Sequence, residues 1–138
     1  MNIRPEQLKL IKQWVEKAEE DFRTAEYLLV LREDCPLNSV CFHSQQCAEK
    51  YIKALLMYCS IQFPKSHDVV ELLNLVPNSY RPDLSINDLA IINRYAVDTR
   101  YPQCWEIITR QEAEESVTIA KDVRQKIRML LGKDVTGQ

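Results

Sequence analysis

The sequence has 138 residues, a net charge of −2, 46% hydrophobic residues and 28% charged residues. This length suits one domain with one core, and the composition argues against wholesale disorder. With a net charge so close to zero, the molecule as a whole does not attract polyanions such as nucleic acid. No apolar run approaches the roughly 18 residues of a membrane span, and the first residues lack a signal-peptide layout. We therefore expect a cytoplasmic protein that makes no membrane contact.

Glycine is nearly absent from the chain. Both glycines, Gly132 and Gly137, lie close to the C-terminus. The rest of the chain therefore has few residues that readily adopt positive φ in a tight turn. Hairpin-rich β structure is disfavoured, and long helices are expected.

The first predicted helix runs from about residue 5 to 32, with Pro5 in its favoured first turn. Its apolar residues recur at spacings of three and four, which predicts one buried face. They are Leu8, Ile11, Val15, Ala18, Phe22, Ala25 and Leu29. We place Glu19, Glu20 and Arg23 on the opposite, solvated side.

The second predicted helix covers residues 37–60. Steps of about 100° per residue separate its side chains into an apolar arc and a polar stripe. The arc holds Val40, Cys47, Ala48, Tyr51, Ile52, Ala54, Leu55 and Tyr58. The stripe holds His43, Gln46, Lys50 and Lys53, with Glu49 beside it.

Capping signals mark the remaining helices. Ser66 or Asp68 can cap a short third helix that ends near residue 76. Ser85 can cap a fourth helix that ends near residue 98.

The fifth predicted helix is long. It starts with a capping box made by Thr109 and Glu112 and stops at Gly132. Five helices with short connections predict an all-α, up-and-down antiparallel bundle of four long helices plus one short helix. This single domain covers residues 1–138.

No standard catalytic constellation is present. The chain has no glycine-rich phosphate loop, no HExxH and no glycine-flanked serine elbow. Its five cysteines are odd in number and form no CxxC, so we expect neither a metal site nor a disulfide framework, and no cofactor. The only histidines are His43 and His67.

Three segments of the sequence resemble the motifs of a known protein family. Residues 41–56 read CFHSQQCAEKYIKALL, residues 64–73 read PKSHDVVELL, and residues 99–102 read TRYP. Together they resemble the HEPN domain family, whose members carry an FHxQQxxEKxxKALL helix, a K(T/S)HDLxxLL segment and an RYP step before the last helix. The likeness extends over nearly the whole chain.

The resemblance implies a helical bundle that usually dimerises and that associates with nucleotides or RNA. Many such proteins are encoded beside a minimal nucleotidyltransferase, with which they form toxin–antitoxin pairs. The catalytic members are metal-independent ribonucleases that use an arginine, four to six further residues, and then a histidine. Arg100 occupies the arginine position, but Trp105, Glu106 and Ile107 stand where the histidine is expected. No histidine follows Arg100 anywhere in the chain.

The candidate ligand or RNA contacts are Arg100, Tyr101, His43, Gln46 and Lys50. His43, Gln46 and Lys50 are either the wet face of an amphipathic helix or the wall of a cleft or dimer seam. In such a seam, a cation and an amide could hold phosphate or a partner's carboxylate. Arg100 either contacts phosphate or bonds the carbonyl end of the fourth helix. Tyr101 precedes a proline and is therefore expected to be extended.

Two further features have ordinary structural explanations. His67 precedes a helix start, where capping or local packing is the favoured role. Lys121, Arg124 and Arg128 share a stripe near the end of the fifth helix, where basic residues suit the helix dipole.

Three functional hypotheses follow. The first, which we favour, is a non-catalytic or weakly active dimeric module that binds a nucleotidyltransferase, with a nucleotide or RNA in its cleft. The second is a metal-independent ribonuclease toxin that uses Arg100 with a displaced His43 or His67. The third is a purely structural dimerisation domain. We expect a homodimer because Phe42 and Met57 fall on the polar side of the second helix, where they should be exposed.

Overall fold

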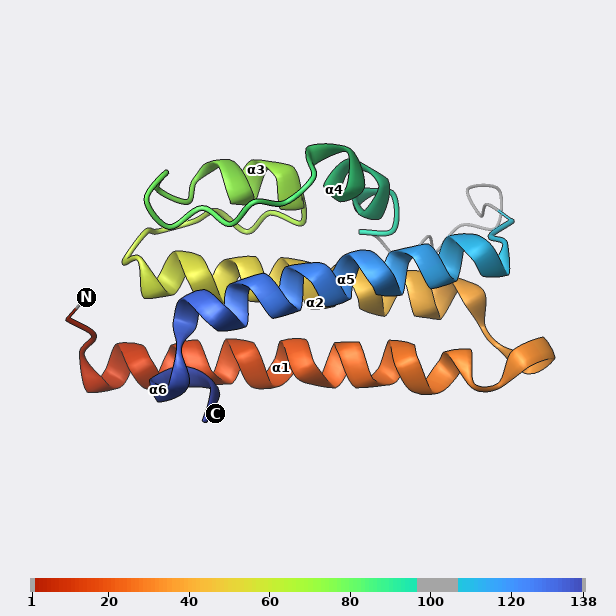
Figure 1. Cartoon of the computed structure of the whole chain (residues 1–138), viewed down its shortest axis with the longest axis horizontal. Coiled ribbons are helices and arrows are strands. Elements are labelled where there is room, and N and C mark those ends of the chain that lie inside the picture. Colours follow the sequence, from red (N-terminus) through yellow and green to blue (C-terminus); the bar gives the residue numbers. More distant parts are fainter. Residues whose placement is uncertain (1, 97–106, 138) are drawn as a thin grey trace.

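Three long helices build the bundle in the computed structural model, which describes residues 2–96 and 107–137. They are α1 (Pro5–Leu29), α2 (Leu37–Tyr58) and α5 (Arg110–Leu131) (Figure 1). The shorter segments are η1 (Arg32–Asp34), α3 (Val69–Asn74), α4 (Ile86–Asn93) and α6 (Lys133–Thr136). The described residues contain no strand, and the all-α fold class is confirmed.

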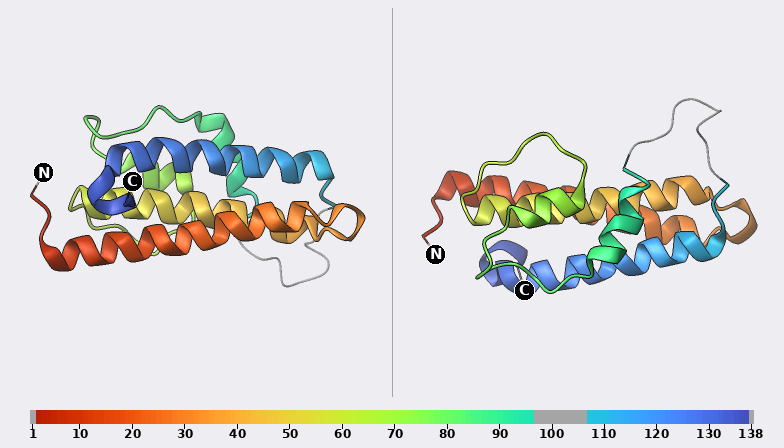
Figure 2. Two further views of the ribbon diagram at one scale, coloured as in Figure 1. Left: turned by 60° about the horizontal axis from the view of Figure 1, so that its bottom comes forward. Right: turned by 90° about the horizontal axis from the view of Figure 1, so that it is seen from above.

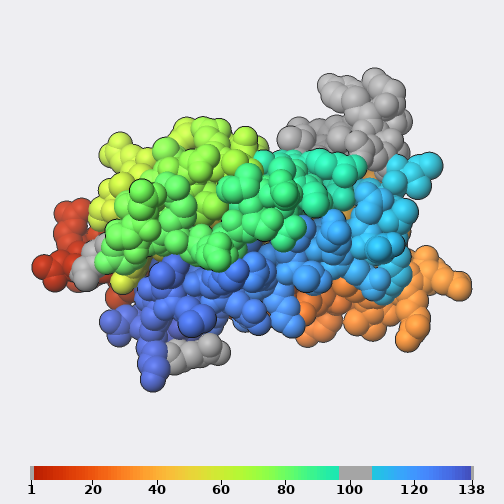
Figure 3. Space-filling model, turned by 45° about the horizontal axis from the view of Figure 1, so that its top comes forward, coloured from red at the N-terminus to blue at the C-terminus, as the bar shows by residue number. Residues whose placement is uncertain are grey.

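The helices alternate in direction along the chain. Helix α1 runs antiparallel to α2, and the chain then returns through α3 and α4, so that α5 runs in the same direction as α2 (Figure 1). The returning arm of this up-and-down bundle is therefore two short helices rather than one long helix. Helices α3 and α4 pack against α2 and α5, on the side away from α1 (Figure 2). The space-filling view shows α4, and the segment between α3 and α4, lying against α5 (Figure 3).

Side-chain caps start three of the helices, as the sequence predicts. Asp68 accepts hydrogen bonds from the backbone amides of Val70 and Glu71 at the start of α3. Ser85 accepts one from the amide of Asp88 at the start of α4. Thr109 and Glu112 form the full capping box of α5. These caps satisfy amides that have no partner within their own helix.

The first four helices end earlier than the sequence predicts, α2 at Tyr58 and α3 at Asn74, and the difference is larger for α1 and α4. Helix α1 ends at Leu29, because the next amides bond carbonyls only three residues back and Arg32 adopts a positive φ of 53°. Helix α4 ends at Asn93, because the amides that follow also bond carbonyls three residues back, as in a 3₁₀-helix. Gly132, with φ 75°, ends α5 as expected.

The core lies where the apolar periodicity places it. Ile11, Ala18 and Ala25 of α1 are fully buried, and Phe22 is 6% exposed. Helix α2 is the central element, and it contacts α1, α3, α4 and α5. Helix α5 buries the apolar residues that recur along it at spacings of three and four; they are Ala113, Val117, Ala120, Val123, Ile127 and Leu131.

Phe42 and Met57 are not the exposed apolar residues that the sequence suggested. Both are partly buried, and Met57 packs against the core. Large exposed apolar side chains occur elsewhere, including Leu10, Tyr27 and Met129. No helix in the described ranges is both long and apolar enough to cross a membrane.

Candidate functional site along the second helix

The structure brings three of the five candidate residues together on α2. His43, Gln46 and Lys50 follow at spacings of three and four, so they share one stripe of the helix. All three are partly exposed; the side chain of His43 is 31% exposed and that of Lys50 is 24% exposed. The other two candidates, Arg100 and Tyr101, lie outside the described residues.

A carboxylate of α1 holds both ends of this stripe. Asp21 Oδ1 lies 2.8 Å from His43 Nδ1, and Asp21 Oδ2 lies 2.6 Å from Lys50 Nζ. The Asp21 side chain is only 10% exposed. Because the anion sits within the same chain, the charge of Lys50 is already compensated before any ligand or partner arrives. The stripe is thus the seam between α1 and α2, not a simple wet face.

Glu49 forms a second polar cluster beside the first. Its carboxylate lies 2.9 Å from Lys53 Nζ and 2.9 Å from His67 Nδ1. Gln46 donates to Gln45 at 2.7 Å, and Gln45 donates to Glu49 at 3.3 Å and to the carbonyl of His67 at 2.8 Å. A chain of hydrogen bonds therefore links the candidate stripe to the segment before α3.

Lys53 corrects the predicted polar stripe, because its side chain is only 8% exposed. Its ammonium lies over the rings of Trp14 and Phe63, 5.6 and 5.9 Å from their centroids. Those rings meet edge to face at 6.1 Å. The Glu49 carboxylate compensates the charge, and the aromatic faces add a favourable cation–π contact. Lys53 thus belongs to the interior and is not available to a ligand.

His67 does not cap α3, contrary to one of the roles expected for it. Asp68 is the capping residue, while the His67 ring reaches back to Glu49 on α2. The His67 side chain is 60% exposed, whereas the Glu49 side chain is 4% exposed. His67 therefore fastens the segment before α3 to the central helix.

The two histidines share one chemical arrangement. In each, Nδ1 faces a carboxylate, and within the described part of the chain Nε2 has no hydrogen-bond partner. A neutral imidazole held in this way donates from Nδ1 and presents Nε2 as an acceptor. With both rings neutral, Asp21 and Glu49 balance Lys50 and Lys53, and the cluster carries no net charge. Its attraction for phosphate therefore depends on protonation of the histidines or on residues beyond the cluster.

The basic stripe of α5 has a different role from the dipole effect expected for it. Arg124 donates two hydrogen bonds to the Glu19 carboxylate, each 2.8 Å, and Arg128 donates a third at 2.8 Å. Arg128 also donates to Tyr51 Oη at 3.2 Å. This network joins α1, α2 and α5. Lys121 is exposed.

Glu19 is therefore not on the solvated side of α1, where the sequence analysis placed it. Its side chain is 16% exposed. Burial raises the pKa of Glu19. The hydrogen bond and charge of Arg124, together with the charge of Arg128, lower it by more, so the pKa lies below its ordinary value. The carboxylate is thus held ionised between two guanidinium groups.

Sequence reasoning missed Asp21. A signal was present, since Asp21 lies three residues after Ala18 and four before Ala25, on an edge of the buried face. A carboxylate at such a position is buried only when a partner compensates it. His43 and Lys50 are seven residues apart on α2, so one carboxylate of a neighbouring helix can reach both.

The comparisons with known proteins identify the family. A profile of the HEPN domain matches residues 11–130. The chain belongs to the HEPN family. It is similar to the protein named "Putative toxin MJ1304" from Methanocaldococcus jannaschii, with 29% identity over 144 residues that cover 90% of each chain.

Two solved structures have the same fold. TT1696 from Thermus thermophilus matches with a TM-score of 0.72 and 26% identity, covering 87% of this chain and 97% of that one. ST0689, described as an archaeal HEPN homologue, matches with a TM-score of 0.69 and 23% identity, covering 88% and 98%. The fold of this HEPN protein is therefore shared along nearly its whole length.

Proposed function

We propose that this HEPN protein is a toxin-like module that acts by binding rather than by cutting RNA. In this proposal it is a homodimer that binds a minimal nucleotidyltransferase, with a nucleotide or RNA near Arg100, Tyr101 and the α2 stripe. The toxin-like role is supported by the similarity to the M. jannaschii protein. The nucleotidyltransferase partner and the nucleotide or RNA ligand are proposed from what the resemblance to the family implies.

The absence of a histidine after Arg100 carries the non-catalytic part of the proposal. Metal-free RNA cleavage needs groups that take a proton from the 2′-hydroxyl and give one to the leaving oxygen. An always-protonated guanidinium stabilises phosphate charge but transfers protons poorly. His43 is held by Asp21, which joins α2 to α1, and His67 is held by Glu49, which joins the segment before α3 to α2. Neither histidine lies in the stretch after Arg100 where the resemblance places the catalytic histidine.

Co-purification from the native host tests the proposal. The tagged chain should bring down a nucleotidyltransferase and a bound nucleotide or RNA, identified by mass spectrometry of proteins and of released nucleotides. Arg100→Ala should reduce the bound nucleotide while the fold is kept. A chain that purifies with neither protein nor nucleotide would contradict the proposal and would favour a purely structural role.

One observation favours ribonuclease activity as a second candidate. The His67 side chain is 60% exposed, and a buried carboxylate orients its ring through Nδ1. A histidine held this way has the arrangement of a general base. Cleavage lost both in His67→Ala and in Arg100→Ala would support this second function.

A further inference from the structure

The surface has a small hollow where the chain leaves α5 and starts α6. Gly132, with φ 75°, makes the turn between the two helices. The hollow is lined by Arg128 and Met129 of α5, by Gly132, and by Lys133 and Thr136 of α6. Two of these residues are cations, and among the described residues that line the hollow none is acidic. The lining therefore carries an excess of positive charge.

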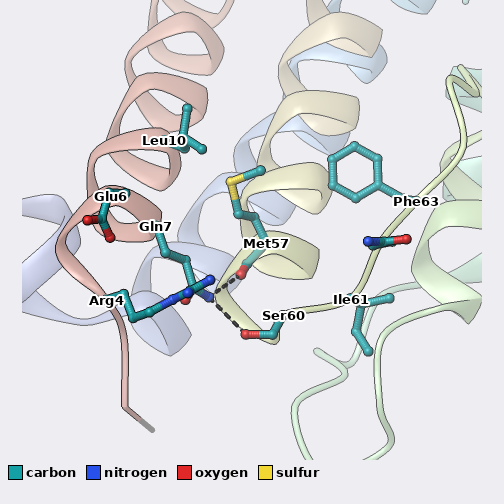
Figure 4. Close-up of a pocket in the computed structure, with 9 residues that line it drawn as sticks. Arg4, Glu6, Gln7, Leu10, Met57, Ser60, Ile61 and Phe63 are labelled. Carbon is teal, nitrogen blue, oxygen red and sulfur yellow. Dashed lines mark hydrogen bonds between the residues drawn. The ribbon is translucent and has the colours of Figure 1, made fainter.

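The larger hollow beside α1 has a different lining (Figure 4). Leu10 of α1 and Met57 of α2 form apolar walls, together with Phe63 from the segment that follows α2. The cation of this hollow, Arg4, is accompanied by the carboxylate of Glu6. One positive and one negative charge balance each other, so the larger hollow has no net attraction for an anion.

The charge of Arg128 is compensated only in part. Glu19 on α1 accepts a hydrogen bond from Arg128 Nη1 at 2.8 Å, but its two oxygens also accept from Arg124, each at 2.8 Å. Arg128 Nη1 also donates to Tyr51 Oη at 3.2 Å. Within the described part of the chain, Nε and Nη2 of Arg128 have no hydrogen-bond partner. Two guanidinium groups thus share one carboxylate, although the Arg128 side chain is only 14% exposed.

Lys133 supplies the second positive charge of the hollow. Its side chain is exposed and forms no ion pair with any residue in the described ranges. Asp134 follows it in the chain but does not line the hollow. A partly compensated guanidinium and an unpaired ammonium therefore border the same space. A charge in a mostly buried position is favoured when an anion compensates it.

We propose that this hollow is a binding site for a phosphate group. The N–H groups of a guanidinium match phosphate oxygens in pairs, and a lysine ammonium binds phosphate as a point charge. The hollow has a volume of about 260 Å³, which is below the roughly 300 Å³ at which pockets for drug-sized ligands begin. It therefore admits a single phosphate group, either inorganic phosphate or the phosphate of a larger molecule, rather than a whole nucleotide.

A phosphate bound here adds a second anion to the network that Glu19 forms with Arg124 and Arg128. Because that network joins α1, α2 and α5, phosphate stabilises the folded chain by mass action. The site shares no residue with the α2 stripe, and it contains neither Arg100 nor Tyr101. The inference therefore goes beyond the proposed function and does not depend on it.

Selective isotope labelling provides a local probe of the site. The chain has two glycines, Gly132 in the lining of the hollow and Gly137 next to Thr136. Protein labelled with ¹⁵N-glycine therefore gives two amide signals in an NMR spectrum, and both report on this end of the molecule. Replacing chloride by inorganic phosphate at constant ionic strength should shift the Gly132 signal along a saturating curve at millimolar concentration.

A parallel titration with dimethyl phosphate identifies the kind of phosphate. A saturating shift with both probes supports a site that also accepts a phosphodiester, such as the backbone of a nucleic acid. A saturating shift with inorganic phosphate alone supports a site for free phosphate or a phosphomonoester.

Matched lysine variants separate the site from net charge. Lys133→Gln should weaken phosphate binding by about tenfold, as the loss of a charged hydrogen bond does, with an unchanged circular dichroism spectrum. Lys121→Gln, at an exposed residue of α5 outside the hollow, makes the same charge change and should keep the wild-type binding curve. Phosphate should raise the urea midpoint less in Lys133→Gln than in Lys121→Gln, a comparison that cancels the general stabilising effect of phosphate.

Two results would overturn the phosphate site. The first is a pair of glycine signals that move with neither probe, or that move linearly and equally in the wild type and in Lys133→Gln. The second is an equal loss of binding in Lys121→Gln and Lys133→Gln, because net charge alone would then account for the attraction.

Discussion

Asp21 Oδ2 on α1 lies 2.6 Å from Lys50 Nζ on α2, and Asp21 Oδ1 holds His43, which precedes Lys50 on the same helix. One nearly buried carboxylate thereby joins the two helices that form the largest contact of the bundle. The consequence is that charge on the α2 stripe is set by α1. A substitution of Asp21 should therefore lower the stability of the fold.

Asp21→Asn should lower the free energy of unfolding by about 1–3 kcal/mol, because it leaves the partly buried Lys50 without its anion. The loss should shrink in Asp21→Asn/Lys50→Met, where both charged partners are removed. Urea unfolding measures both. The control is Glu20→Gln on the exposed face, which should change stability by less than about 0.5 kcal/mol. A single variant as stable as the wild type would contradict the structural role of the pair.

Glu19 should make the protein less stable in acid. Its pKa in the folded protein lies below the ordinary value of 4.5, so the unfolded chain takes up the proton first. This contribution to stability is present above about pH 4.5 and is lost as the pH falls through the lower pKa of the folded state. Glu19→Gln should therefore flatten the acid side of the stability profile.

Urea midpoints measured from pH 7 to pH 3 test this dependence. Glu16→Gln, at an exposed position of the same helix, should keep the wild-type slope. Asp68 also has a lowered pKa, caused first by the amide of Glu71, and should supply part of the slope that remains. An unchanged profile in Glu19→Gln would count against the arginine network.

Phe22→Ala should cost about 3–5 kcal/mol, the usual loss for truncating a buried phenylalanine. The ring is 6% exposed, and the guanidinium of Arg124 lies 5.0 Å from its centroid. The melting temperature should fall by several degrees or more. Ala54→Asp, at a fully buried position of α2, should prevent folding. A shift of less than one degree in Phe22→Ala would show that the core is assigned wrongly.

Cys41 and Cys47 should resist thiol reagents in the folded protein. Both are fully buried, and burial raises the pKa of each thiol, so little thiolate is present at neutral pH. Labelling followed by peptide mass spectrometry should find both unmodified in buffer and modified in urea. Labelling of Cys47 as fast as in urea would mean that α2 opens readily.

RNA cleavage without added metal should be negligible for the wild type and for Arg100→Ala, His43→Ala and His67→Ala. The physical reason is the lack of a histidine after Arg100, since general acid–base catalysis is worth about 10²–10⁴-fold. Synthetic RNA and gel analysis are sufficient. Robust cleavage lost on changing Arg100 and either histidine would establish the ribonuclease instead.

Local signals predicted much of the fold. The spacing of the apolar residues around Phe22 and the caps at Ser85 and Thr109 each depend on residues a few positions apart, so the sequence displays them directly. The ends of α1 and α4 were predicted less well, because turns such as the one at Arg32 depend on what the following segment packs against. Helix α6 was missed because it buries only Val135.

The polar clusters could not be predicted as well as the core. Glu19 and Arg124 are far apart in the sequence, and only the register of α1 against α5 brings them together. Lys53 appeared solvated because its burial is achieved by Trp14 and Phe63, which lie on other elements. Spacing along one helix gives the direction of a side chain but not its partner.

The polar residues of the α2 segment that resembles the family motif form hydrogen bonds and ion pairs within the chain. The amides and charges of the α2 signature each bind another group of the chain: Gln45, Gln46, Glu49, Lys50 and Lys53. Selection for correct assembly alone would be enough to keep these residues in place. In this chain the α2 signature is therefore evidence for the architecture, and the activity has to be inferred from other residues.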